Sequence, residues 1–360
     1  MNHAKREQVI DKVPAVLAET DAVVALDHAS PGRPQAGMNG KDDERPAVMQ
    51  EFNSRGTRVI KNRNVQTLAD CWKASARGMV KDKKMAEDRQ AGMWSKRSGD
   101  FAKHVKDKRG KKRSAEILGL LEEAGFKAKG AKVLDIGCGP GTLSIPLARL
   151  GADVTSLDIA PGMLDELRKY AKDEGLAVNP LECSWWTADI DQLGFRKKYD
   201  LVLASMTPGV RDAETFDRMM ACSKKFCYYS HFLGGGPHGM NPEIRKILDG
   251  DEKAPGRKAP NGRGHGPGIA YPFMYLYALG YHPLVRFSHN RWKMETDWKE
   301  AAERTIGFLE HDEAFDAAAK KKVMAYYQAN AKEGKYTTQS EMYTGMMVWN
   351  VNTPAAKKGA

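Results

Sequence analysis

Residues 133–141 constrain the fold more than any other part of the sequence. They read Val-Leu-Asp-Ile-Gly-Cys-Gly-Pro-Gly, an apolar run that ends in an acid and continues into glycines at alternate positions. Glycine has no Cβ and adopts backbone conformations that other residues avoid, so such a turn lets the main chain approach a ligand closely. The segment therefore predicts a buried strand followed by a ligand-binding turn.

The residues after this turn alternate between helical and strand-like patterns. Residues 142–151 and 161–175 have helical patterns, and residues 152–159 form an apolar run between them. This alternation is typical of a parallel sheet with crossover helices. Five further strands are predicted, at residues 184–188, 199–205, 226–232, 282–289 and 341–350. The prediction is an α/β fold with seven strands.

The chain divides into three predicted regions. Residues 1–60 include a turn-rich, charged stretch and predict a flexible leader. Residues 61–125 have a helical pattern rich in Lys and Arg, which predicts two or three basic helices before the core. Residues 126–360 form the predicted core, with a helical insertion at residues 296–331 before the last strand.

A glycine-rich loop is predicted at residues 234–268. It contains ten glycines and five prolines, too many for regular structure apart from a short helical pattern at residues 242–248. Long loops in compact domains are usually functional or disordered. A lid over a binding site and a disordered segment are therefore both open interpretations of this loop.

The positive charge lies in one part of the chain. The formal net charge is +11, and residues 61–113 hold 17 basic and 6 acidic residues, whereas residues 114–360 hold 32 and 31. The larger part of the chain has no excess charge of the kind that an enzyme needs to follow a phosphate backbone. The basic run at 103–113 is interpreted as a solvated helix end or linker, with contact to RNA or an acidic partner as the alternative.

Composition also bears on the compartment. No run of 18 or more apolar residues occurs, which argues against a membrane span and a signal peptide. The five cysteines form no Cys-x-x-Cys pair, which argues against a disulfide framework and a metal site. These cysteines are Cys71, Cys138, Cys183, Cys222 and Cys227. A cytoplasmic protein without a metal is predicted, and the sequence is silent on oligomeric state.

Spacing separates the glycine turn from two common alternatives. Its glycines follow the pattern G-x-G-x-G at Gly137, Gly139 and Gly141, rather than the G-x-G-x-x-G of dehydrogenases, and no Lys-Ser or Lys-Thr follows as in a P-loop. Asp158 ends the next strand, 21 residues after Gly137, where a carboxylate suits the two ribose hydroxyls of an adenosine. Asp189 follows a third apolar patch. Because parallel strands end at one edge of a sheet, these residues predict a single pocket.

Residues 130–232 resemble the class I S-adenosylmethionine-dependent methyltransferases in four successive motifs. The motifs are the glycine turn, Asp158, Ala188-Asp189 and Ser205-Met206-Thr207. The resemblance implies a Rossmann-like, mostly parallel seven-stranded sheet with helices on both faces. It also implies S-adenosylmethionine as the cofactor and methyl transfer as the activity, and the basic helices at 61–125 are similar to the variable N-terminal cap of this family.

The resemblance further implies roles for individual residues. Asp135, Gly137 and Gly139 would flank the amino-acid end of the cofactor, and Asp158 would hold the ribose. The remaining cofactor-binding candidates are Cys138 and Gly141 in the turn, Ile159, Ala188 and Asp189 around the adenine, Ser205 and Met206 between cofactor and acceptor, and Trp94 over the cofactor.

Candidates for a general base lie in and after the predicted strand at 226–232. Alternation along a strand places either Tyr229 and His231, or Tyr228 and Ser230, on the face near the ligand. His231 and Tyr229 are the predicted catalytic residues, since a histidine accepts a proton at neutral pH. His238 in the glycine-rich loop is a further histidine that could do so.

The predicted function is transfer of a methyl group to a small-molecule acceptor. Ser205-Met206-Thr207-Pro208 departs from the Asn/Asp-Pro-Pro-Tyr signature of enzymes that methylate exocyclic amines of nucleobases. One alternative is an RNA or protein methyltransferase that docks through the basic segment at 61–113. The other is a cofactor-binding subunit without catalytic activity.

Overall fold

The computed structural model describes most of the chain after the predicted leader. The described residues are 63–76, 83–235, 242–249, 268–309 and 315–353. The predicted leader at 1–60 lies outside them, and so does most of the predicted glycine-rich loop, including His238.

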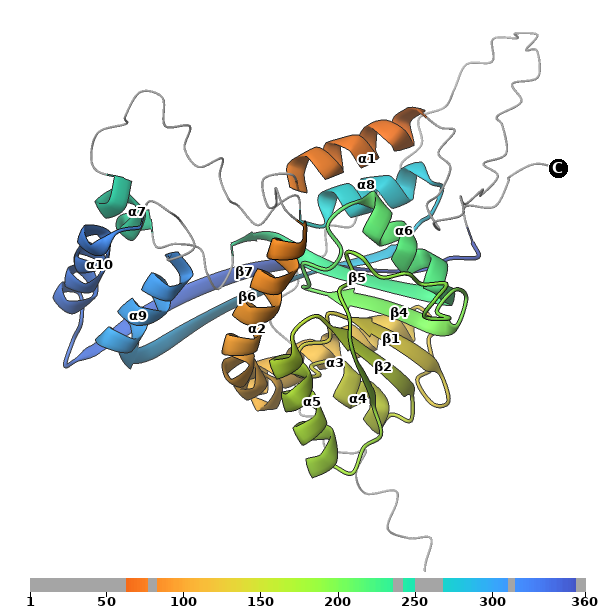
Figure 1. Ribbon diagram of the computed structural model, residues 1–360, viewed down its shortest axis with the longest axis horizontal. Coiled ribbons are helices and arrows are strands. Elements are labelled where there is room, and N and C mark those ends of the chain that lie inside the picture. The colour runs from red at the N-terminus through yellow and green to blue at the C-terminus, as the bar shows by residue number, and fades with distance from the viewer. Residues whose placement is uncertain (1–62, 77–82, 236–241, 250–267, 310–314, 354–360) are drawn as a thin grey trace, which may run out of the picture. The chain divides into compact units, whose positions relative to one another are not determined.

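The described residues contain seven strands and ten helices (Figure 1). The strands are β1 (Lys132–Ile136), β2 (Asp153–Asp158), β3 (Asn179–Glu182), β4 (Tyr199–Ser205), β5 (Ser223–Gly235), β6 (Leu284–Asp297) and β7 (Lys335–Asn350). The helices are α1 (Arg63–Ala76), α2 (Lys83–Lys106), α3 (Lys108–Glu123), α4 (Ser144–Arg149), α5 (Pro161–Asp173), α6 (Ala213–Cys222), α7 (Pro242–Asp249), α8 (Ala270–Ala278), α9 (Trp298–Leu309) and α10 (Ala317–Ala329).

All seven strands belong to one sheet. Their order is β3-β2-β1-β4-β5-β7-β6, and β7 is antiparallel to both of its neighbours while the other pairs are parallel. The predicted α/β fold with a mostly parallel, seven-stranded sheet is confirmed. The parallel pairing brings the carboxyl ends of β2, β1, β4 and β5 to one edge, which is where open α/β sheets bind ligands.

Helices cover both faces of the sheet, as its alternating residues require. On one face, buried residues of the sheet pack against α1, α6 and α8, with Phe216 of α6 in contact with Trp72, Tyr229 and Trp349. On the other face, α3 and α4 pack against the sheet through residues such as Leu120. α5 packs beside α4 through a smaller apolar cluster. The sheet is therefore buried on both sides, as parallel sheets are.

The last two strands form a hairpin that is longer than the rest of the sheet. Pairing of β5 with β7 ends at Gly235 and Met342, whereas pairing of β6 with β7 continues to Asp297 and Lys335. The hairpin therefore extends past the carboxyl end of β5 (Figure 1). Helices α7, α9 and α10 share an apolar cluster with Tyr336 of this extension. We call these three helices and their cluster the hairpin helices.

Two predicted regions contain helices. Residues 61–125 hold α1, α2 and α3, and the predicted insertion at 296–331 holds α9 and α10. Helix α2 packs against α5, and α1 packs against α8. The short helical pattern at 242–248 corresponds to α7. In the described part of the chain, no helix combines the length and apolar character needed to cross a membrane.

The predicted strand at 184–188 is wrong. The third strand is instead β3, which pairs with β2 at the end of the sheet, and residues 185–187 form a turn. Trp185 donates its indole N–H to the carbonyl of Thr215, and Arg218 donates to the carbonyls of Trp185 and Trp186. Arg218 thus occupies two backbone carbonyls that would accept hydrogen bonds from a neighbouring strand if residues 184–188 formed a strand. Pro180 is tolerated in β3 because β3 is an edge strand.

Candidate functional site

The glycine turn after β1 has the backbone that only glycine adopts easily. Gly137, Gly139 and Gly141 have φ values of 66°, 55° and 94°. A Cβ at Gly137 would lie 2.0 Å from Oγ1 of Thr207, so the turn is packed closely there. A Cβ at Gly139 would meet no atom within 4 Å. Gly139 therefore faces open space that a ligand can approach.

Asp158 at the end of β2 fixes this turn. Its Oδ2 accepts a hydrogen bond from the backbone N–H of Gly139 at 2.8 Å, and its Oδ1 accepts from the N–H of Ala160 at 2.9 Å. The side chain is 7% exposed, and burial raises its pKa. Each carboxylate oxygen has a second lone pair, so both oxygens can still accept a hydrogen bond from a ligand hydroxyl.

Asp135 lies beneath the turn in a chain of buried polar groups. The hydroxyl of Ser156 donates to Oγ of Ser144 at 2.8 Å, and the hydroxyl of Ser144 donates to Oδ2 of Asp135 at 2.7 Å. Burial, with a smaller effect from the charge of Asp158, raises the pKa of Asp135 to about 7. The two acids therefore form a buried, electronegative floor under Gly139, which suits a cationic ligand.

Cys138 is buried inside the same turn. Burial raises the pKa of its thiol well above the ordinary value, and the charges of Asp135 and Asp158 add to the effect. The thiol stays protonated at neutral pH, and it is no nucleophile. Among the described residues, no group of three or more His, Cys, Asp or Glu side chains is arranged to hold a metal ion.

The predicted adenine-side residues lie at the ends of β2 and of the turn that follows β3. Ile159 is half-buried, and Ala188 is 8% exposed. Asp189 is exposed, and its Oδ1 accepts hydrogen bonds from the backbone N–H groups of Asp191 and Gln192 at 2.9 and 3.0 Å. Asp189 therefore shapes the local turn, and its carboxylate is held at the surface.

The end of β4 contains a strained residue. Met206 has a φ of 54°, a value that costs energy for a residue other than glycine. Its N–H donates to the carbonyl of Ser230 on β5 at 2.9 Å, which holds the backbone in this conformation. Ser205 precedes it, and its hydroxyl lies 3.0 Å from that of Ser230. Strained residues of this kind concentrate at functional sites.

Helix α2 lies against the edge where these residues gather. The hydroxyl of Ser95 accepts a hydrogen bond from the N–H of Gly162 in the first turn of α5, at 3.3 Å. Glu87 accepts hydrogen bonds from the hydroxyls of Ser184 and Thr187 at 2.5 and 3.0 Å. The helix thus spans from α5 to the turn that carries Ala188.

Trp94 has neighbours within its own helix. Its indole N–H donates to Oε1 of Gln90 at 2.8 Å, and its ring meets Phe101 edge-on at 5.6 Å. The guanidinium of Arg97 lies 5.5 Å from the Trp94 ring. These contacts hold the ring on α2 and do not connect it with the glycine turn.

The two predicted catalytic residues lie on the face of the sheet that α1, α6 and α8 cover. Tyr229 is 2% exposed and contacts Phe216, and burial raises the pKa of its hydroxyl far above the ordinary value. His231 is half-buried at the carboxyl edge, with its ring stacked 6.2 Å from that of Tyr229. Tyr229 therefore supports the His231 ring from below, and His231 is the residue nearer the edge of the sheet.

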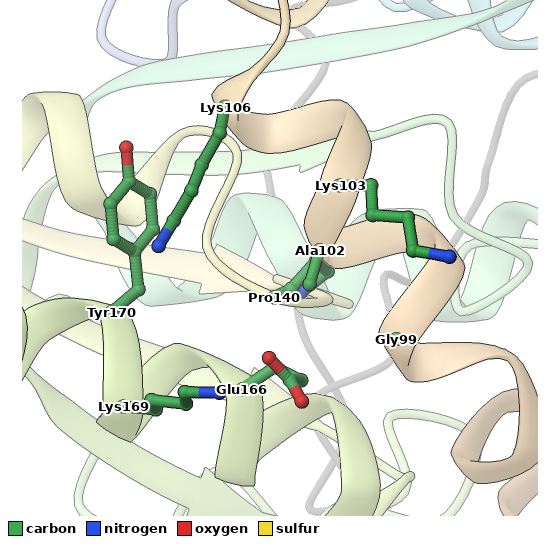
Figure 2. A pocket seen from close by; sticks show the side chains of 8 residues that line it. All are labelled: Gly99, Ala102, Lys103, Lys106, Pro140, Glu166, Lys169 and Tyr170. Atoms are coloured by element: carbon green, nitrogen blue, oxygen red, sulfur yellow. The ribbon is translucent and has the colours of Figure 1, made fainter.

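A cavity of about 300 Å³ lies between α2 and α5 (Figure 2). Pro140 of the glycine turn forms part of its wall, and the side chains of Lys103, Lys106 and Lys169 surround it. Figure 2 shows the Lys106 side chain beside the ring of Tyr170, with its ammonium 4.4 Å from the ring centre. The cavity adjoins the glycine turn through Pro140.

Two residues of the site were absent from the sequence predictions. Glu87 lies in a charged stretch of α2 with no motif around it. Arg113 was part of the basic run at 103–113, yet its side chain reaches the end of β4 and donates to Oγ of Ser205 at 3.3 Å. A signal for Arg113 existed, since it precedes the buried residues Ile117 and Leu120 of α3 at helical spacing.

The fold and the glycine turn define the class of this protein. It is an α/β protein with a ligand-binding turn at the carboxyl edge of β1 and β2, lined by two buried acids.

Comparison with known proteins identifies the domain. Residues 133–226 match the family model described as a methyltransferase domain. The chain is 33% identical over 149 residues to an uncharacterized protein of Haemophilus influenzae, covering 40% of this chain and 53% of that protein. It is 41% identical over 85 residues to the ubiquinone biosynthesis O-methyltransferase of Shewanella pealeana, covering 24% of this chain and 35% of that enzyme. The matches thus span about half or less of these curated relatives.

Solved structures are similar at a lower level. The magnesium protoporphyrin IX methyltransferase of Synechocystis PCC 6803 with bound SAH is 18% identical, with a TM-score of 0.42, and the match covers 74% of this chain and 99% of that one. At this TM-score the likeness carries no argument about function. Residues 133–226 therefore match a methyltransferase domain, which confirms the methyltransferase resemblance seen in the sequence over that part of the chain.

Proposed function

We propose that this protein is an enzyme that transfers a methyl group from S-adenosylmethionine to a small-molecule acceptor. The observation that carries the proposal is the open space in front of Gly139, with the N–H of Gly139 bonded to Asp158 at the end of the next strand. This arrangement offers exposed backbone and a carboxylate together. Those are the groups that an adenosyl nucleotide with ribose hydroxyls requires.

The residues around the glycine turn fit this cofactor. The carboxylate of Asp158 would accept the ribose hydroxyls, and Ile159 and Ala188 would provide apolar contacts for the adenine. Asp135, close beneath Gly137, would supply negative charge below a sulfonium cation. The open space at Gly139 would admit the cofactor, whereas the close contact of Gly137 with Thr207 would set the floor of the site.

When bound, S-adenosylmethionine would supply a methyl group already activated on a sulfonium sulfur. The protein's task would then be to align an acceptor atom behind that methyl group and to exclude water. The ends of β4 and β5 would do this on the acceptor side, since Met206 and His231 both lie at this edge. The hairpin helices and α2 would enclose the acceptor.

His231 would serve as the general base for an acceptor that must lose a proton, such as a hydroxyl. Tyr229 would act beneath it as a support for the ring, because its buried hydroxyl has a raised pKa. A free amine or a thiolate acceptor needs no base, so the contribution of His231 depends on the acceptor. The cytoplasm stays the predicted location of this activity.

Asp158→Asn tests the cofactor assignment. The amide cannot offer two anionic oxygens to the ribose, so the affinity for S-adenosylhomocysteine should fall by about tenfold to a hundredfold in titration calorimetry. Asp165→Asn is the matched control, because Asp165 lies on α5 with its side chain 72% exposed and bonded only to a surface arginine. Equal affinity in the Asp158→Asn protein and the wild type would contradict the assignment, and so would absence of binding to the wild type.

The acceptor class requires a separate experiment. The purified protein is incubated with methyl-labelled S-adenosylmethionine and a size-fractionated lysate of its host. Label is expected in the fraction of small metabolites. Label confined to RNA or protein would contradict the small-molecule acceptor and favour docking through the basic segment at 61–113. Cofactor binding without label in any fraction would favour a non-catalytic subunit.

A further inference from the structure

A group of hydroxyls lies at the carboxyl edge of the sheet, on the face that α3 covers. Side chains alternate along a strand, so the residues that continue the apolar rows of this face can be read from the core. Leu203 on β4, Tyr228 on β5 and Met346 on β7 all belong to the apolar cluster beneath α3. Two residues further along these rows lie Ser205, Ser230 and Thr344. Ser205 is the last residue of β4, whereas β5 and β7 continue past Ser230 and Thr344, and Thr344 pairs with Phe232.

Arg113 reaches into this group from α3. Its guanidinium donates to Oγ of Ser205, and the hydroxyls of Ser205 and Ser230 are 3.0 Å apart. Burial lowers the pKa of Arg113, and the nearby Tyr228 and Glu116 oppose that effect. We call Arg113, Ser205, Tyr228 and Ser230 the Arg113 cluster.

The cluster has more hydrogen-bonding capacity than the protein uses. Arg113 is half-buried, and in the described part of the chain no carboxylate lies within ion-pair distance of it. A guanidinium offers several N–H donors, of which one donates to Ser205. Tyr228 is buried, and its hydroxyl interacts with the hydroxyls of Ser230 and Ser205, so the guanidinium of Arg113 is the group with N–H donors to spare. Unsatisfied buried donors are costly, and a ligand that satisfies them would remove that cost.

The position of the cluster places it on the acceptor side of the site. Along the sheet, β2 with Asp158 is followed by β1, β4 and β5. Ser230 on β5 is therefore three strands, or about 14 Å, from the ribose position at the end of β2. Only one ring and one methylene separate the ribose hydroxyls from the sulfur of an adenosyl sulfonium. The cluster thus lies beyond the sulfur, where an acceptor would be.

We infer that the Arg113 cluster binds a carboxylate group of the methyl acceptor. This inference rests on the proposed function and names the chemical class of its substrate. A carboxylate fits because it accepts two hydrogen bonds from a guanidinium and has lone pairs left for hydroxyl donors. The guanidinium of Arg113 supplies one positive charge and Glu116 adds a negative charge nearby, so a singly charged carboxylate fits better than a dianionic phosphate.

The test uses benzoate and benzamide as probes, because they share a shape and differ in charge. Both are titrated into the full-length protein saturated with S-adenosylhomocysteine, and binding is followed by calorimetry. The wild type should bind benzoate at least about tenfold more tightly than benzamide. Arg113→Gln should abolish this preference, and Arg113→Lys should keep part of it, because lysine retains the charge but not the two-pronged geometry.

Lys112→Gln is the matched control. It removes one positive charge at the neighbouring position, but its side chain is 71% exposed and makes no hydrogen bond to Ser205 of the kind that Arg113 makes. This variant should keep the wild-type preference for benzoate. Thermal unfolding of each variant checks that it is folded, and the comparison of the two probes on the wild type requires no variant at all.

Three results would overturn the inference. The first is equal affinity of the wild type for benzoate and benzamide, and the second is a benzoate preference that survives in Arg113→Gln. The third is that Arg113→Gln weakens the binding of S-adenosylhomocysteine but not the binding of its decarboxylated analogue. That result would assign Arg113 to the carboxylate of the cofactor. Failure of the wild type to bind S-adenosylhomocysteine would instead contradict the proposed function, and the benzoate preference is then measured without cofactor.

Discussion

Asp135→Asn should stabilise the protein at pH 8 and leave its stability near pH 4 almost unchanged. Burial, with the charge of Asp158, raises the pKa of Asp135 from the usual 3.8 to about 7. Because this pKa is higher in the folded protein than in the unfolded chain, the folded protein retains a proton that the unfolded chain releases. The stability associated with protonated Asp135 is therefore complete below about pH 4, and it is lost as the pH rises through 7.

The magnitude follows from the pKa. One pKa unit corresponds to about 1.4 kcal/mol, so ionised Asp135 costs about 4 kcal/mol of unfolding free energy at pH 8. Asparagine does not ionise, and its side-chain oxygen can still accept the hydrogen bond from Ser144, which is 2.7 Å long in the wild type. The variant should therefore be more stable than the wild type by about 2 to 4 kcal/mol at pH 8.

Urea unfolding at pH 5, 6, 7 and 8, followed by tryptophan fluorescence without cofactor, measures this difference. The gain from Asp135→Asn should grow from pH 5 to about pH 7 and then level off toward pH 8, where the folded protein has also released the proton. Asp158 has a raised pKa for the same reason, so a smaller slope in the same direction should remain in the variant. Asp88→Asn, at an exposed position of α2, is the control and should change nothing. A stability difference that is independent of pH would refute the reasoning.

Two further predictions concern the stability of the fold. Gly137→Ala should destabilise the protein by more than about 2 kcal/mol in urea unfolding, because its Cβ would lie 2.0 Å from Thr207 and its φ is 66°. Gly130→Ala, with a φ of 75° but nothing near its Cβ, should cost only about 1 kcal/mol, and equal costs would argue against the contact. Asp212→Ala should cost about 1 kcal/mol, since its side chain accepts a hydrogen bond from the N–H of Thr215 at the start of α6. An unchanged urea midpoint would show that this cap contributes nothing.

The first half of the core could be predicted because its signals are local. The glycine turn, Pro161 in the first turn of α5 and Gly175 after its last turn each determine a backbone conformation by themselves. Asp158 at the end of β2 is likewise recognisable from its position directly after an apolar run. These residues predict both the fold and the cofactor side of the site, since each effect acts within a few positions along the chain.

Other parts of the fold depend on contacts between distant residues. The turn at 185–187 has the composition of a strand, and it is Arg218, more than thirty positions away, that takes its carbonyls. Helix α6 went unpredicted although Asp212 and Thr215 form a capping box before it. Arg113 was hidden by the lysines around it, because charge counted over a segment does not show which face of a helix each residue occupies.

The hairpin of β6 and β7 has a mechanical consequence. Among the described residues, the sheet continues beyond Gly235 as β6 and β7 alone, and a two-stranded ribbon twists and bends more readily than a wide sheet. The helices at its tip are therefore joined to the edge that carries the glycine turn through the most compliant piece of the sheet. Evolution can lengthen or reshape that tip without altering the register of the inner strands, so under the proposed function a change of acceptor would leave the binding of the methyl donor undisturbed.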